Sequence, residues 1–422
     1  MGTLIPVLEP EELAWQHFHN PRTDAGQPYP SELQKILNYR DFAAAKAVIE
    51  ALPLYSQTPT HRMHGLAAAL GIAELYVKDE STRFGLGTFK GVGGAYAVYC
   101  LLKARAERLG VGVCSAQDFL DHKHPGVSAG LTVVCATTGN HGRSVARAAQ
   151  MFGCRCVIYV PAAMSRGRIT ALEALGARIV RPPGSTYDSV VKQAESDARL
   201  NGWSVISDTA YEGQVDTPRD VMHGYRVIVD EVVQQVSTAP PTHVFVQTGV
   251  GGIAASFASH FWEVWGNKRP RFVVVESKEA ACMLQSAQAD HPVTIEGEFS
   301  TRMAGLAAGE PSTLAWQILR VGADDFVTIA DAPALLAMRL LASRFDGDPP
   351  VVSGEAGGAG LGSLIVALSQ GATRDALGLN RSTRALVIVT EGATDPEAYQ
   401  SIVGRAAAQV LGDRSPSPSP DE

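Results

Sequence analysis

The feature that most constrains this fold is a regular alternation of short apolar runs with amphipathic segments of helical length. Buried parallel strands are expected to be nearly continuous apolar runs, and these runs have that composition. Alternating strand and helix segments predict parallel sheets covered by helices, which is an α/β fold. The runs that predict strands, some with the loop that follows, are 131–138, 154–161, 242–252, 271–280 and 385–395, and those that predict helices are 142–153, 165–177 and 187–202.

The length of the chain predicts more than one lobe. Its 422 residues exceed what a single ordinary core holds. Apolar residues make up 45% and charged residues 19%, the composition of a well-packed protein rather than a disordered one. The Pro/Ser alternation near the C-terminus is typical of a disordered tail, which we expect over residues 410–422.

One lysine stands in an unusual setting, the stretch GLGTFKGVGG from Gly85 to Gly94. Lys90 has five glycines and the aromatic Phe89 around it. A lysine exposed on the surface does not require such neighbours. We interpret Lys90 as a residue that meets a ligand inside a closed site.

A second motif, TTGNHGRSVARAA, begins at Thr137 where a predicted strand passes into a predicted helix. Glycines there allow tight turns and a close approach of the backbone to a ligand. Asn140 offers a hydrogen-bond donor and an acceptor, and His141 follows it. The alternative is an ordinary polar helix N-terminus in which Asn140 is a turn residue.

The motif QTGVGGIAAS, residues 247–256, predicts an anion site. Backbone N–H groups at a strand-to-helix turn, together with the helix dipole, bind anions, and phosphate is the expected occupant. The same residues also match the dinucleotide pattern G-x-G-x-x-A, so an NAD-binding oxidoreductase is a competing interpretation. Its acidic partner would be Glu276, which lies further along the chain than the usual distance of about 20 residues. A simple tight turn is a third interpretation.

Two later motifs add candidate residues. In VVSGEAGGAG, residues 351–360, the only charge is Glu355, and the glycines predict close backbone approach to a ligand or close packing of a helix on a sheet. In VTEGATD, residues 389–395, Thr390 follows a predicted buried strand. Ligands of α/β proteins gather at the carboxyl ends of such strands. The alternative for Thr390 is a loop that faces solvent.

Taken in this order, the motifs resemble the fold type II family of pyridoxal phosphate enzymes, whose fold is that of the tryptophan synthase β chain. Within that family they are most similar to the diaminopropionate ammonia-lyases. The resemblance covers roughly residues 35 to 400, and MAGLAAGEP and DTAYEG are useful discriminators because generic threonine dehydratases are not expected to carry them. It implies two parallel-sheet α/β lobes with the cofactor between them. The large lobe would comprise residues 1–92 and 225–422, and the small mobile lobe residues 93–224.

The resemblance also implies a role for each motif. Lys90 would form the Schiff base with pyridoxal 5'-phosphate, and the small glycines beside it would leave room for ring and substrate. A neutral hydroxyl at the pyridine nitrogen would leave that nitrogen largely unprotonated, which suits β-elimination better than transamination. The remaining cofactor contacts would be Asn140 at the ring hydroxyl, Gly249, Val250, Gly251, Gly252 and Ile253 at the phosphate, Thr390 at the pyridine nitrogen, and Glu355.

The substrate contacts implied by the resemblance are Asp208, Thr137, Thr138 and His141. Asp208 resembles a substrate-binding carboxylate, and an anion there would hold the β-ammonium group of 2,3-diaminopropionate. Its alternative role is helix N-capping. Thr138 departs from the family pattern, in which an aspartate precedes the glycine of G-N-H-G and serves as the base for D-substrates. A threonine hydroxyl is too weak a base for that task, so the L-isomer is favoured.

The predicted activity is therefore a pyridoxal phosphate-dependent α,β-elimination, with 2,3-diaminopropionate converted to pyruvate and ammonia. In that reaction the freed Lys90 would remove the Cα proton. A dehydratase acting on serine, threonine or 3-hydroxyaspartate is the alternative within the same chemistry, and Thr138 favours it. The NAD-binding oxidoreductase is more remote because it explains neither Lys90 nor G-N-H-G. A non-catalytic cofactor-binding protein is disfavoured by the presence of both Lys90 and Asp208.

Composition argues against several other partners. A net charge of −7 and a pI of about 5.9 favour neither nucleic acid nor an anionic membrane. No apolar run reaches the roughly 18 residues of a membrane span, and the N-terminus has no apolar signal-peptide segment. The six cysteines show no metal-ligand spacing. We expect free thiols, a cytoplasmic location, a small amino-acid substrate, no bound metal and, from the resemblance, a homodimer.

Overall fold

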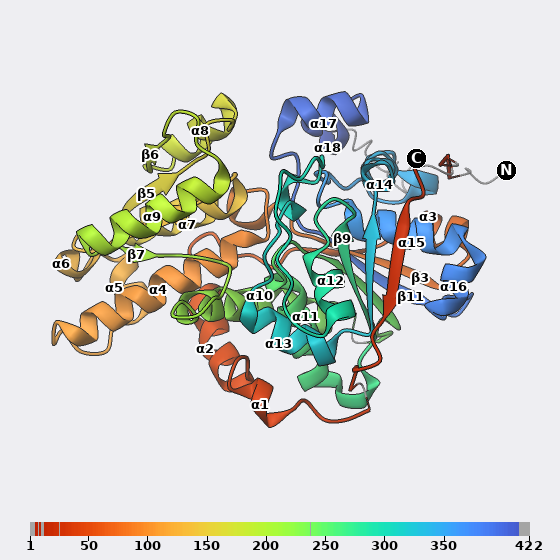
Figure 1. Cartoon of the computed structure of the whole chain (residues 1–422), viewed down its shortest axis with the longest axis horizontal. Helices are drawn as coiled ribbons and strands as arrows, with labels where there is room; N and C mark the ends of the chain where they lie inside the picture. The colour runs from red at the N-terminus through yellow and green to blue at the C-terminus, as the bar shows by residue number, and fades with distance from the viewer. Residues whose placement is uncertain (1–4, 7, 10–11, 25, 237, 413–422) are drawn as a thin grey trace, which may run out of the picture.

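The computed structural model describes residues 5–6, 8–9, 12–24, 26–236 and 238–412. Two sheets dominate it: a 7-stranded sheet in the order β1-β10-β9-β8-β11-β3-β2 and a 4-stranded sheet in the order β6-β5-β4-β7. In Figure 1 the small sheet and its helices lie on the left and the large sheet on the right. The α/β class predicted from the apolar runs is confirmed, and two sheets are present as the resemblance implies.

The strands differ in direction between the centre and the edges of the large sheet. The five central strands are parallel, whereas β1 and β2 pair with their neighbours in antiparallel fashion. All pairs of the small sheet are parallel. The strands are β1 (Trp15–His19), β2 (Thr60–Arg62), β3 (Glu74–Asp79), β4 (Thr132–Ala136), β5 (Arg155–Tyr159), β6 (Arg178–Val180), β7 (Ser204–Val205), β8 (His243–Gln247), β9 (Arg271–Ser277), β10 (Asp325–Ile329) and β11 (Arg384–Val389).

Helices connect most of these strands and cover both sheets (Figure 1). They are α1 (Ser31–Gln34), α2 (Tyr39–Glu50), α3 (His64–Leu70), α4 (Lys90–Arg108), α5 (Ala116–Leu120), α6 (Pro125–Ser128), α7 (Asn140–Phe152), α8 (Arg166–Glu173), α9 (Tyr187–Asn201), α10 (Asp216–Gln235), α11 (Gly252–Trp265), α12 (Cys282–Ala289), α13 (Thr313–Gly322), α14 (Asp331–Ala342), α15 (Ala359–Ser369), α16 (Gly371–Ala376), α17 (Pro396–Val403) and α18 (Ala407–Gly412).

The alternation of side chains along the buried strands explains why helices pack on both faces. In β8, Val244 and Val246 belong to the cluster formed with α10, α11 and α13, whereas Phe245 belongs to the cluster formed with α3, α14 and α15. In the small sheet, Val133 of β4 packs toward α4 and α7, and Val134 packs toward α9. Strands buried on both faces in this way are apolar at nearly every position, as predicted.

The cluster that includes α10 and α11 runs without a break into the small sheet. It contains residues of α4 and α7 as well as of β8, β9 and β11. The two predicted lobe boundaries, at 92/93 and 224/225, fall inside α4 and α10. These two helices therefore join the sheets, and the mobility of the small lobe stays a prediction.

The C-terminal segment differs in part from the predicted disordered tail. Residues 410–412, expected in the disordered tail, belong instead to α18, where Val410 is buried; residues 413–422 lie outside the described residues.

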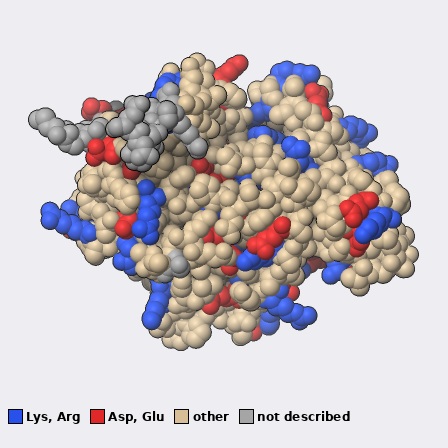
Figure 2. All heavy atoms as spheres, turned by 180° about the vertical axis from the view of Figure 1, so that it is seen from behind, with Lys and Arg blue, Asp and Glu red and all other residues tan. Residues whose placement is uncertain are grey.

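Figure 2 shows basic and acidic side chains interspersed over the rear face. Of the helices in the described part of the chain, none combines the length and the apolar character that a membrane span requires.

Candidate active site

Lys90 and Asp208 form an ion pair at the junction of the two sheets. Lys90 is the first residue of α4, and its Nζ lies 2.5 Å from Oδ2 of Asp208, which follows β7. The two side chains are 20% and 19% exposed, so both are accessible to a small molecule. The backbone N–H before Lys90, that of Phe89, donates to the carbonyl of Thr390 at the end of β11 (3.0 Å). Lys90, Asp208 and Thr390, which come from separate sequence motifs, thus lie near one another at this junction.

The glycines around Lys90 have a different role from the one predicted. A Cβ on Gly93 would lie 2.5 Å from the ring of Tyr225, and one on Gly94 would lie 2.1 Å from Oγ of Ser144. Gly224 meets the backbone of Gly93, where its Cβ would lie 2.7 Å from Cα. These glycines allow α4 to approach α7 and α10 closely, so they fix the position of Lys90 rather than leave room for ring and substrate.

His141 holds Asp208 from the other side. Its Nε2 lies 2.9 Å from the carbonyl oxygen of Ile206, so this nitrogen donates and Nδ1 faces Oδ2 of Asp208 at 3.7 Å. Burial lowers the pKa of His141, and Asp208 offsets part of that effect. Burial by itself would raise the pKa of Asp208, but the Lys90 ammonium and His141 hold it well below its usual range. Asp208 is therefore a carboxylate, and it stands outside any helix that it could cap.

The predicted phosphate loop joins β8 to α11. Gly251 has a φ of 101°, and a Cβ there would lie 2.2 Å from Cε of Met283, so only glycine fits. The N–H groups of Gly249 and Val250 have no partner among the described residues, and the first turn of α11 leaves further N–H groups unpaired. A Cβ on Gly252 would lie 3.8 Å from the carbonyl oxygen of Asp208, which places this cradle beside the ion pair.

Thr390 is buried at the end of β11 with its hydroxyl held by Gln247. Nε2 of Gln247 donates to Oγ1 of Thr390 (3.1 Å) and to the carbonyl of Ile388 (2.7 Å). Because Oγ1 already accepts this hydrogen bond, the hydroxyl hydrogen is free to be donated to another acceptor. An unprotonated ring nitrogen is such an acceptor.

Asn140 and Glu391 connect the loops of the two sheets. Nδ2 of Asn140, the first residue of α7, donates to Oε2 of Glu391, whose Oε1 accepts from the N–H of Ala356 (3.2 Å). Glu391 also forms an isolated bridge with Thr88, close to Lys90. Burial raises the pKa of Glu391 above its usual range despite the hydrogen bond from Asn140.

Three other predicted residues have contacts outside the ion pair. Oγ1 of Thr137 accepts from the N–H groups of Gly139 and Gly142, so it shapes the loop. Thr138 is exposed, and its carbonyl accepts from Nη1 of Arg168 (3.3 Å). Glu355 is half-buried, and burial together with the nearby Asp395 raises its pKa.

The structure removes the support for the dinucleotide interpretation. Glu276, the acid that would bind a ribose, is fully buried. Its two oxygens accept from the N–H groups of Met283 (2.8 Å) and Leu284 (2.7 Å) in the first turn of α12. A carboxyl group used in this way is not free to bind a sugar hydroxyl.

Four residues that hold the site together were not among the predicted ones: Gln247, Glu391, Ser144 and Tyr225. Gln247 and Glu391 stand inside motifs that the sequence singles out, so their polar character next to a predicted strand end was the available signal. Ser144 donates to the carbonyl of Lys90 (2.6 Å), and the rings of Tyr225 and Phe89 are 4.8 Å apart. Ser144 also stands inside a motif that the sequence singles out, TTGNHGRSVARAA, whereas the partner of Tyr225 lies at the start of another helix and leaves no local signal.

The residues present fit pyridoxal phosphate in three respects. A half-buried amine is available in Lys90, unpaired N–H groups form an anion cradle beside it, and Thr390 has a hydroxyl whose oxygen already accepts from Gln247, which leaves its hydrogen for donation. When bound, this cofactor withdraws electrons from the Cα of an amino acid.

Comparisons with known proteins agree with this chemistry. The family model "Pyridoxal-phosphate dependent enzyme" matches residues 51–408. Diaminopropionate ammonia-lyase of Escherichia coli (strain K12) is 37% identical over 354 residues, 83% of this chain and 87% of that protein. A crystal structure of the Escherichia coli lyase with an aminoacrylate–PLP azomethine intermediate superposes with a TM-score of 0.81 at 33% identity, covering 92% of this chain and 97% of that one.

A more distant relative shows how identity and coverage fall outside the lyases. The biosynthetic L-threonine dehydratase of Bacillus subtilis (strain 168) is 25% identical over 201 residues, 47% of this chain and 45% of that protein. Similarity to the lyases is thus both higher and more extended. The chain belongs to the family of pyridoxal-phosphate dependent enzymes and is a relative of the diaminopropionate ammonia-lyases.

Proposed function

We propose that this enzyme eliminates the β-amino group of 2,3-diaminopropionate. The substrate loses ammonia from Cβ, and addition of water to the remaining three-carbon unit releases the α-nitrogen as a second ammonia and leaves pyruvate. The atoms balance with one water consumed for each diaminopropionate. Similarity to the lyases over most of the chain supports this substrate class.

The observation that carries the proposal is the ion pair of Asp208. In the structure the Asp208 carboxylate holds the ammonium of Lys90 at 2.5 Å. If Lys90 holds the cofactor covalently, its ammonium would no longer be available to Asp208, and this half-buried carboxylate would be free to pair with another cation. A substrate with a β-ammonium group restores the balance, whereas serine and threonine do not.

The other residues have positioning roles in this proposal. The cradle of Gly249 to Ile253 would hold the phosphate and Asn140 the ring hydroxyl, and Glu355 is assigned to the same cofactor site. Thr390 donates to the ring nitrogen and keeps it unprotonated. Lys90 takes the Cα proton of the L-isomer. Thr138 offers no base for the D-isomer, which we expect not to be turned over.

The experiment that tests this function compares substrates and one substitution. Pyruvate release is measured for D- and L-diaminopropionate, serine, threonine and 3-hydroxyaspartate. The wild-type enzyme is expected to prefer L-diaminopropionate, and Asp208→Asn to lose that preference over serine by at least about tenfold in kcat/KM.

The matched control is Asp216→Asn, an exposed residue at the start of α10 that pairs with Arg219. It should leave the preference unchanged. A wild-type enzyme that turns over serine or threonine faster than L-diaminopropionate would identify it as a dehydratase instead.

Three broader features belong to the same proposal. We expect a homodimer, a cytoplasmic location and closure of the small lobe over the substrate, which would exclude water. The six cysteines are free, which supports a reducing compartment. Light scattering of the purified enzyme tests the dimer.

A further inference from the structure

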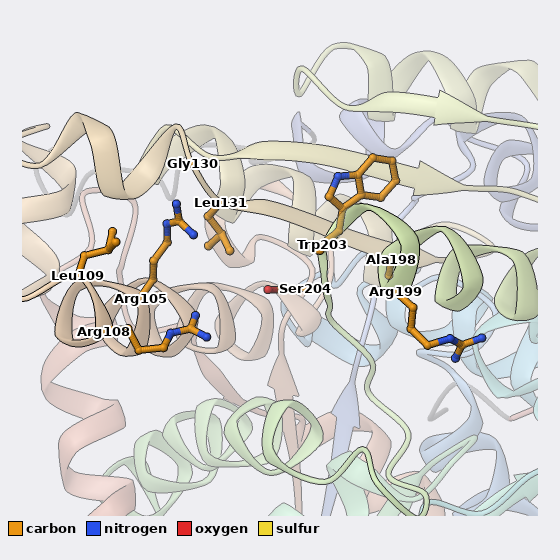
Figure 3. Close-up of a pocket in the computed structure, with 10 residues that line it drawn as sticks. Arg105, Arg108, Leu109, Gly130, Leu131, Ala198, Arg199, Trp203 and Ser204 are labelled. Atoms are coloured by element: carbon orange, nitrogen blue, oxygen red, sulfur yellow. The ribbon is translucent and has the colours of Figure 1, made fainter.

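A second cavity lies at the end of the small sheet opposite to Lys90. It has a volume of about 430 Å³, and its lining includes Gly130 and Leu131, which precede β4, and Ser204, which begins β7. Because β4 and β7 are parallel, the cavity lies at their amino ends, whereas Thr137 and Asp208 follow their carboxyl ends. Figure 3 shows the side chains that line it, from α4, α9 and the two strand ends.

Arg105 is held in this cavity by the surrounding backbone. Its Nε donates to the carbonyl of Val127 (3.1 Å). A Cβ on Gly130 would lie 2.2 Å from Nη2, so the guanidinium lies against a backbone that has no side chain there. Its terminal nitrogens have no hydrogen-bond or ion-pair partner among the described residues. Arg105 is therefore oriented without being neutralised.

Two more arginines line the same cavity, and no carboxylate does. Arg108 lies one turn after Arg105 on α4, and Arg199 comes from the last turn of α9. The nearest acids of α9 are engaged elsewhere, since Glu195 and Asp197 accept from the hydroxyls of Tyr211 and Tyr159.

The local excess of positive charge contrasts with the protein as a whole. The chain has a net charge of −7, yet three arginines and no carboxylate line this cavity, Arg105 and Arg108 on α4 and Arg199 across from them on α9 (Figure 3). Arginines near a helix C-terminus are favourable through the helix dipole alone. That effect does not explain why they share a concave site with an oriented Arg105.

The remaining lining is suited to a planar group. Trp203 is one of the residues that line the cavity, and the guanidinium carbon of Arg178 lies 5.5 Å from the centre of its indole. Leu131 adds an apolar surface, and the hydroxyl of Ser204 has no hydrogen-bond partner within the described ranges. Guanidinium and hydroxyl groups together are the donors that phosphate oxygens accept from.

We propose that this cavity binds a small phosphate monoester with a planar apolar part. The phosphate would accept from Arg105, Arg108 and Ser204, and the planar part would lie on Trp203 and Leu131. Such a ligand would connect α4, which begins at Lys90, with β7, which leads to Asp208. The site goes beyond the proposed function and does not depend on it.

The test uses cofactor-loaded enzyme, so that the phosphate cradle beside Lys90 is already filled. Isothermal titration calorimetry measures binding of phenyl phosphate, inorganic phosphate and phenol. Phenyl phosphate is expected to bind at one site per chain, more tightly than inorganic phosphate, and phenol not to bind. Absence of phenyl phosphate binding, or equal binding of the two phosphates, would overturn the proposal.

Substitutions locate the binding. Arg108→Gln changes an exposed side chain, so folding is not at risk, and it is expected to weaken phenyl phosphate binding at least about tenfold. Trp203→Ala should weaken phenyl phosphate more than inorganic phosphate. The control is Arg381→Gln, an exposed arginine next to the large sheet, which should change nothing. Affinity for phenyl phosphate that is the same in Arg108→Gln and in the control would refute the site.

Discussion

At the scale of single residues, Asp208 has one role before the substrate binds and a related role afterwards. The Asp208 carboxylate holds the Lys90 ammonium now, and in the proposed reaction the same oxygen holds the substrate ammonium. His141 lies on the other side of Asp208, with its Nδ1 3.7 Å from Oδ2, and burial lowers the pKa of its imidazole while Asp208 raises it. In this proposal, attachment of the cofactor to Lys90 frees Asp208, and the free carboxylate favours a substrate that carries an ammonium group.

Lys90→Ala should abolish both attachment of the cofactor and most of the turnover. Removal of the group that accepts the Cα proton is expected to lower kcat by about 10²–10⁴-fold. After borohydride reduction of the loaded enzyme, mass spectrometry should find the cofactor on the Lys90 peptide of the wild type only. Lys103→Ala, on the same helix, is the control. Full turnover by Lys90→Ala would exclude the proposed chemistry.

Thr390 tests the contact at the ring nitrogen. Thr390→Val removes the hydroxyl but keeps the shape, and we expect kcat to fall about tenfold, the effect of one lost hydrogen bond of about 1.4 kcal/mol. Thr390→Ser keeps the hydroxyl that accepts from Gln247 and should stay near the wild type. Equal loss in both variants would mean that packing, not donation, is what matters at this position.

At the scale of elements, the close packing of α4 against α10 fixes the position of α4. It therefore also fixes the position of Lys90, the first residue of that helix. Gly93→Ala introduces a Cβ 2.5 Å from the ring of Tyr225 and 2.9 Å from the carbonyl of Val221. Overpacking of this kind costs about 1–3 kcal/mol of the free energy of unfolding. Urea unfolding checks this value, and kcat should fall as well because α4 shifts.

The matched control for Gly93→Ala is Gly167→Ala. Gly167 lies inside α8, and a Cβ there meets no atom within 4 Å. Alanine favours helix over glycine by about 0.5–1 kcal/mol, so this variant should be as stable as the wild type or more so. The same effect of both substitutions would show that the crossing is not tightly packed.

Elements with strong apolar patterns could be predicted from the sequence, and edge elements could not. The strands β4, β5, β8, β9 and β11 were recognisable because both of their faces are buried. The edge strand β1 was not, because it carries polar residues whose partner is distant: Nε2 of His17 lies 2.8 Å from Oδ1 of Asp325 in β10. Such a contact leaves no pattern in the local sequence.

The same limit applies to the site. Lys90, Asp208 and the phosphate loop could be predicted because their types and neighbours are distinctive. The glycines near Lys90 were recognised but misinterpreted, since their partners Ser144 and Tyr225 come from other helices. Glu391 was missed because its bond to Asn140 joins residues far apart in the sequence.

At the scale of the whole molecule, buried histidines couple stability to pH. Burial and the nearby Arg226 lower the pKa of His223 to about 3, and burial lowers that of His260 to about 4, from an ordinary value of 6.5. Between pH 6.5 and these values the unfolded chain binds protons that the folded chain does not. The free energy of unfolding must therefore fall as the pH falls through this range.

His223 offers the sharpest test because neither of its ring nitrogens has a hydrogen-bond partner among the described residues. His223→Leu keeps a similar volume without a buried unpaired polar group, so at pH 7 the variant should be as stable as the wild type or more stable. At pH 4.5 it should exceed the wild type by about a further 2–3 kcal/mol, because the proton uptake of the unfolded state at this position is gone. Urea unfolding at both pH values measures the difference, with the exposed His291→Leu as control. Parallel loss of stability in His223→Leu and the wild type would show that His223 does not contribute to the acid sensitivity of the fold.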